Sequence, residues 1–135
     1  MIIMAKFEKR LRKSIPHIEN ALVIGRGFDK LSEVLEIFNT VFLISNNRPD
    51  VRSKKLVYKE DYSDLVNVVD ITAVFVDLDH ITNLEHINPI LKKGHTVVFV
   101  QGSDPIGREF SKPLYDNGYQ CIELQEHYHT WKLKQ

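Results

Sequence analysis

The sequence has few cysteines, no net charge, no long apolar run and no common catalytic or metal-binding motif. Cys121 is the only cysteine among 135 residues, so neither an internal disulfide nor a zinc site of several thiolates can form. The 18 Lys and Arg residues balance 18 Asp and Glu residues, so no net charge attracts the protein to nucleic acid or to an anionic membrane. No apolar run approaches the roughly 18 residues of a membrane-spanning helix. A nucleophile elbow, a Walker loop and zinc-ligand spacing are missing too.

The overall composition is that of an ordinary globular protein. Hydrophobic residues make up 43% of the chain and charged residues 27%, which excludes a disordered or collagen-like chain. The length suits one domain with its own core, so we expect a single domain over residues 1–135. The apolar start, residues 1–4, leads directly into cations and lacks the longer apolar stretch of a signal peptide. We therefore expect a soluble, cytoplasmic protein.

Residues 5–14 have the pattern of a short basic helix. Phe7 and Leu11 stand four apart on one side, five cations lie on the other, and Pro16 ends the helix. We take residues 1–19 as this helix and its lead-in. The cations could contact RNA or lipid, although a solvated helix face is their commoner role.

From Ala21 onwards, short apolar runs alternate with amphipathic stretches of helical spacing, which indicates successive βαβ units. The unbroken apolar character of the runs predicts parallel strands covered on both faces. These runs are residues 21–24, 41–44, 56–58, 73–76 and 96–100. The clearest crossover helix is predicted by the stripe Leu31, Val34, Leu35 and Phe38, and a weaker one by Leu84, Ile87, Ile90 and Leu91 before Gly94.

The last third of the chain predicts a different ending for the sheet. A turn-rich loop at 102–107 precedes a short helix at 110–117, which Gly118 stops. Residues 121–124 and 128–133 alternate apolar with polar side chains around a turn at 125–126, as half-exposed strands do. The fold class expected is therefore α/β: a three-layer Rossmann-like sandwich whose mostly parallel, seven-stranded sheet ends in an antiparallel C-terminal hairpin.

In such a sheet, ligands bind beyond the carboxyl ends of the strands, so the residues after each run are the candidate site. Gly25, Arg26, Gly27 and Phe28 follow the first run. Glycines there let the backbone approach a ligand and leave N–H groups free at a helix N-terminus. The alternative is a tight turn into the helix with Asp29 as its N-cap.

Polar residues follow the second and third runs as well. Ser45 and Asn46 come after the second, where the Asn46 amide could bind a ribose, and Arg48 could instead bind the 2′-phosphate of NADP. A polar turn ended by Pro49 explains the same residues. Asp61, after the third run, could accept a hydrogen bond from an adenine amine or cap a helical turn.

The fourth run ends in the acids Asp77 and Asp79, followed by His80. These groups could orient a substrate, act as a base or hold a metal ion, or they could be solvated loop residues. His127 and His129 stand two apart and would share one strand face as a ligand pair, but no third ligand is visible. Cys121 reads as a small apolar strand residue.

Taken in chain order, these segments resemble the class I S-adenosylmethionine-dependent methyltransferases from about Asn20 to Lys134. The resemblance is carried by residues 21–27, 56–65, 91–98, 114–119 and 129–134, with Asp77 at the active-site loop. It implies S-adenosylmethionine as cofactor and Asp77 and Asp79 as catalytic residues. The cofactor residues that it implies are Gly25, Arg26, Gly27, Phe28, Ser45, Asn46, Asp61 and Asp77.

The sequence departs from that family where the cofactor is held. Val23 replaces the acid two residues before the first glycine, Asp29 replaces the third glycine, and Ser45-Asn46 lacks the ribose acid. Losing one charged acceptor typically costs about 1.5–3 kcal/mol of binding.

Three functions therefore stay open. The leading one is a small methyltransferase-like protein that binds S-adenosylmethionine or a related nucleoside, with an unknown acceptor. The second is an NADP-binding oxidoreductase or sensor, from Gly25-x-Gly27 and Arg48. The third is a non-catalytic module that binds a partner protein or forms a homo-oligomer.

Overall fold

The computed structural model describes residues 6–25, 31–44, 53–59, 70–77, 87–93, 96–101, 108–125 and 128–133. In these residues helices and strands alternate along the chain. Their bounds, in order, are α1 (Lys6–Ser14), β1 (Asn20–Ile24), α2 (Leu31–Ile37), β2 (Thr40–Ile44), β3 (Leu56–Lys59), β4 (Ile71–Asp77), α3 (Asn88–Leu91), β5 (Val97–Gln101), α4 (Arg108–Asp116), β6 (Tyr119–Gln125) and β7 (Tyr128–Leu133).

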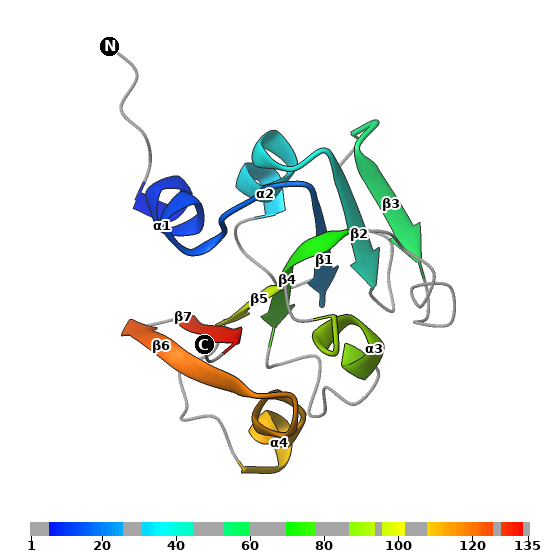
Figure 1. Cartoon of the computed structure of the whole chain (residues 1–135). Coiled ribbons are helices and arrows are strands. Elements are labelled where there is room, and N and C mark those ends of the chain that lie inside the picture. Colours follow the sequence, from blue (N-terminus) through cyan, green and yellow to red (C-terminus); the bar gives the residue numbers. More distant parts are fainter. Residues whose placement is uncertain are drawn as a thin grey trace.

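The strands form one seven-stranded sheet in the order β3-β2-β1-β4-β5-β7-β6 (Figure 1). The pairs among β1 to β5 are parallel, and β7 is antiparallel to both β5 and β6. This confirms the predicted mostly parallel sheet with an antiparallel C-terminal hairpin. Because β2 and β4 flank β1 on opposite sides, the order of the strands reverses between β1 and β4.

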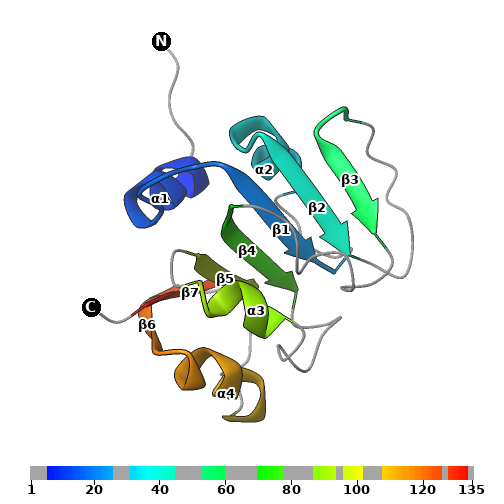
Figure 2. The ribbon, with the colours of Figure 1, turned by 45° about the vertical axis from the view of Figure 1, so that its right-hand side comes forward.

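Helices cover both faces of the sheet, which makes three layers (Figures 1 and 2). Leu11 of α1 and Val34 of α2 belong to the apolar cluster on one face. Leu91 of α3 and Leu114 of α4 belong to the cluster on the other. Alternate residues of each central strand feed the two clusters, and all seven residues of β4 are buried. The apolar runs in the sequence are therefore continuous because both strand faces need cover.

The predicted element ends shift where pairing extends a strand. β4 begins at Ile71 instead of Ala73, since Ile71 pairs with Asn20. β6 begins at Tyr119 instead of Cys121, since Tyr119 pairs with Leu133 and is buried. Gln125 was expected in the turn but pairs with Tyr128 as the last residue of β6. Longer strands thus follow from partners that a local pattern does not reveal.

The predicted helices are present with small changes in length. α1 is confirmed, and α4 begins at Arg108 and ends before Gly118, whose φ of 83° suits a helix stop. Of the weaker helix, α3 is the described part, while Leu84 and Gly94 lie outside the described residues. None of the described helices is long and apolar enough to span a bilayer.

Candidate functional site

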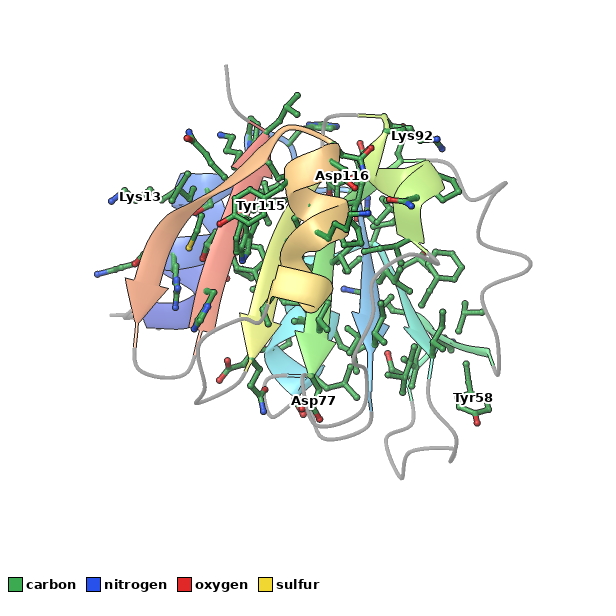
Figure 3. All side chains as sticks on the ribbon, turned by 90° about the horizontal axis from the view of Figure 1, so that it is seen from below. Lys13, Tyr58, Asp77, Lys92, Tyr115 and Asp116 are labelled. Carbon is green, nitrogen blue, oxygen red and sulfur yellow. The ribbon has the colours of Figure 1, made fainter. Side chains whose placement is uncertain are left out.

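The carboxyl ends of the parallel strands lie along one edge of the sheet. At this edge β1 ends at Ile24, β4 at Asp77 and β5 at Gln101. Figure 3 shows Asp77 at this edge, whereas Lys92 and Asp116 lie toward the opposite one. Since the strand order reverses between β1 and β4, their ends form the switch point at which α/β sheets bind ligands.

Gly25 is the first residue after β1 and takes a backbone conformation that suits glycine. Its φ is 103°, and its buried N–H donates to the carbonyl oxygen of Ile44 at 2.9 Å. This bond extends the contact of β1 with β2 by one residue beyond Ile24. An L side chain at this φ would be strained, so the position favours glycine and leaves the backbone uncovered by a Cβ atom.

Asp77 ends β4 on the neighbouring strand. Val76 pairs with Ile24, so Asp77 stands one position further along, level with Gly25. Its carboxylate is the one charged group of β4, and the residue is only 2% exposed. A buried carboxylate next to Gly25, at the switch point, is the polar centre of the candidate site.

Gln101 ends β5 and pairs with Asp77. Phe75 and Phe99 pair two positions earlier and both pack in the cluster under α1 and α2. Because side chains alternate along strands, Asp77 and Gln101 leave the sheet on this same face. Sequence reasoning missed Gln101, since the predicted strand ended one residue early; the usable signal was a polar residue directly after an apolar run.

The structure describes two of the predicted site residues, Gly25 and Asp77, and brings them to adjacent strand ends. The other predicted site residues lie outside the described residues: Arg26, Gly27, Phe28, Ser45, Asn46, Asp61 and Asp79. Their assignments stay predictions, as do those of Arg48, His80 and His127. No group of three metal-ligating side chains occurs in the part of the chain that the structure describes.

His129 belongs to a second polar cluster, where α1 meets the hairpin. Arg10 donates from Nη2 to Thr130 Oγ1 at 3.1 Å, and its Nε lies 3.5 Å from Glu123 Oε2. Burial, and then the charge of Arg10, lower the pKa of His129. These contacts fasten α1 to β6 and β7, which is a structural role.

The structure locates one of the positions at which this sequence differs from the methyltransferases that it resembles. Val23, where the family has an acid, is fully buried in the cluster under α1 and α2. A carboxylate there would have no water to solvate it, so the valine fits its apolar surroundings. Gly25 and Asp77 fit a nucleoside cofactor at the switch point, whereas Val23 offers it no charged acceptor.

Comparisons with known proteins find structural likeness alone. No family model matches the sequence, and no curated protein matches it. A candidate type II methyltransferase from Anaeromyxobacter dehalogenans aligns with a TM-score of 0.55 at 16% identity, over 80% of this chain and 55% of that one. Precorrin-6y C5,15-methyltransferase from Geobacter metallireducens aligns with a TM-score of 0.51 at 12% identity, over 91% of this chain and 84% of that one.

This chain spans only 55% of the length of the first of these two proteins. At sequence identities this low, the two comparisons support a shared fold alone. The strand order and the antiparallel last strands support the same fold independently. The chain therefore has the Rossmann-like fold of the S-adenosylmethionine-dependent methyltransferases.

Proposed function

We propose that the protein binds S-adenosylmethionine at the carboxyl edge between β1 and β4 and transfers its methyl group to an acceptor. The observation that carries this proposal is Gly25, with its φ of 103°, beside the buried Asp77 at the switch point. An uncovered backbone suits close approach by a ligand. A carboxylate held at the neighbouring strand end suits an acceptor that must be oriented.

The proposed roles follow from the order of the strand ends. The backbone of residues 25–28 would hold the amino-acid end of the cofactor, Asn46 the ribose and Asp61 the adenine, while Asp77 would face the reacting centre. In the reaction the bond from the methyl carbon to the sulfonium sulfur breaks as a bond to the acceptor atom forms. S-adenosylhomocysteine leaves, and the acceptor loses a proton if that atom carried one.

Calorimetric titration with S-adenosylmethionine and S-adenosylhomocysteine tests the proposal. Because charged acceptors are missing, we expect weak binding, weaker by about tenfold for each lost acceptor than in a family member that has it. Wild-type protein that gives no heat at millimolar ligand would exclude cofactor binding.

A matched pair of glycine variants separates binding from backbone strain. Gly25→Ala and Gly118→Ala both place a Cβ atom at positive φ, 103° and 83°, but Gly118 lies near the opposite edge of the sheet, beside Leu133. We expect both variants to lose stability and only Gly25→Ala to lose affinity, by about tenfold or more, because its Cβ crowds the cofactor backbone contact. Equal affinities in the two variants would place the ligand elsewhere.

A second candidate function is a non-catalytic module that binds a partner protein, and the buried Val23 favours it. The same titration distinguishes the two, since this module predicts no heat with any nucleoside. It also predicts a stable homo-oligomer or a bound partner in size-exclusion chromatography.

A further inference from the structure

The ends of β4 and β5 carry an amide and a carboxylate in register. Gln101 follows four consecutive buried apolar residues in β5, and Asp77 follows six buried residues in β4. Neither polar group serves the apolar clusters that the rest of these strands build. Both stand at the edge where the proposed function needs groups that touch the acceptor.

The register sets how these two side chains lie. Paired Cα atoms on neighbouring strands are about 4.8 Å apart, and alternation sends both side chains out on the face of α1 and α2. The side chain of Gln101 is one methylene longer than that of Asp77, so it can reach further past the sheet edge. Asp77 is buried and Gln101 is half-buried, so a bound group would meet the amide from the solvent side.

The two groups differ in hydrogen-bonding character. An ionised carboxylate accepts only, whereas a carboxamide has two N–H donors and one acceptor oxygen. A ligand that presents an N–H and a carbonyl oxygen side by side complements both at once. Its N–H would donate to Asp77, and its carbonyl would accept from the Gln101 amide.

We propose that Asp77 and Gln101 together recognise an amide edge on the methyl acceptor, either a carboxamide or the equivalent edge of a nitrogen heterocycle. Gln101 is then a specificity-determining residue that the sequence did not indicate. As a statement about the acceptor, this inference rests on the proposed function. The binding preference of the pair, however, can be measured without cofactor.

Ligand-observed NMR with benzamide and acetophenone tests the pair. These probes have the same ring and nearly the same shape, but acetophenone carries a methyl group where benzamide carries the N–H donors. The full chain is titrated with each probe, with and without S-adenosylhomocysteine. We expect wild type to prefer benzamide by about tenfold, since one well-placed hydrogen bond to a charged group is worth that much.

Two variants with the same chemical change give the control. Gln101→Leu removes the amide at the site, and Gln120→Leu removes an exposed amide on β6, near the opposite edge of the sheet. Both probes have the carbonyl oxygen that would accept from Gln101, so we expect Gln101→Leu to weaken the binding of both probes by about fivefold and Gln120→Leu to weaken neither. The affinity for S-adenosylhomocysteine should stay unchanged within twofold in both variants. Circular dichroism melting of both variants confirms that they are folded.

The outcomes separate this inference from the proposed function. A benzamide preference in wild type, with both probes weakened in Gln101→Leu but not in Gln120→Leu, supports the pair. Equal binding of the two probes by wild type, or probe affinities that Gln101→Leu leaves unchanged, overturns it even if the cofactor binds. A benzamide preference and probe affinities that depend on Gln101, in a protein that never binds S-adenosylhomocysteine, support the amide site and remove methyl transfer.

Discussion

The guanidinium of Arg10 donates to the hydroxyl of Thr130 at 3.1 Å, which joins the first helix to the last strand across 120 residues of sequence. The same side chain lies 3.5 Å from the carboxylate of Glu123 and is only 10% exposed. A cation that has lost most of its water needs such partners. Arg10 therefore fixes where α1 sits on the hairpin.

Replacing Arg10 by methionine should destabilise the protein while keeping the helix. Hydrogen bonds to charged groups contribute about 1.5–3 kcal/mol each, so we expect a loss of that size in the free energy of unfolding from urea titration. Arg12→Met is the control, because Arg12 is 50% exposed and its contact with Glu8 is 3.7 Å long. That variant should lose less than about 0.5 kcal/mol. Equal losses in the two variants would contradict an anchoring role for Arg10.

Arg10 also shows what a local pattern can predict. The spacing of Phe7 and Leu11 predicts the helix, but it puts Arg10 among the solvated cations, since nothing nearby in sequence announces Thr130 or Glu123. The central parallel strands were predictable because each needs apolar residues on both faces, which leaves a continuous run. A run does not predict its own ends, because strand ends depend on distant partners.

The sequence likewise predicts some residues of the candidate site and misses others. Gly25 and Asp77 were predictable as site candidates, because a glycine and an acid directly after apolar runs must lie at the strand ends. Gln101 was missed because the predicted strand stopped at Val100, one residue short of β5. Which of these polar groups meet depends on strand order, and that order is set by packing across the whole sheet.

His129 should make the protein less stable in acid. Burial and the charge of Arg10 lower its pKa below the ordinary 6.5, so the unfolded chain takes up the proton more readily than the folded one. The contribution of His129 is complete above about pH 6.5 and is lost as the pH falls through the lowered pKa. Urea titrations between pH 7.5 and about 5 measure this loss as a falling free energy of unfolding.

His129→Gln removes the titrating group and should flatten that decline, although its stability at neutral pH changes too. The control is Gln120→Asn, because Gln120 is exposed on the neighbouring strand β6 and the change removes no titratable group. We expect this control to keep the wild-type slope of stability against pH. A His129→Gln variant with an unchanged slope would show that another group causes the acid loss.

Ionisation of Tyr119 should destabilise the protein in the alkaline range. Burial raises its pKa from 10.0 to about 12, against a smaller opposing effect of a backbone hydrogen bond at Thr96, and its hydroxyl lies 3.3 Å from the Leu91 carbonyl oxygen. The raised pKa gives stability that is complete below pH 10 and is lost as the pH rises toward 12. Tyr119→Phe should weaken this decline. The absorbance of tyrosinate, followed as the pH is raised, measures this ionisation. If every tyrosine in the folded protein ionised near pH 10, the raised pKa of Tyr119 would be contradicted.

Phe75 is the position where we expect the largest loss of stability. Its ring stacks on Phe99 at 5.0 Å and meets the edge or face of Phe38 at 5.9 Å, and all three are almost fully buried. Phe75→Ala removes these ring contacts and leaves a cavity between α2 and the sheet, at a cost of about 3–5 kcal/mol. Tyr115→Ala is the comparison: Tyr115 is 61% exposed and its ring meets Trp131 at 5.3 Å, so it should cost about 1 kcal/mol. Urea titration with equal m-values measures both. If Phe75→Ala cost no more than Tyr115→Ala, the aromatic stack would not be what holds α2 to the sheet.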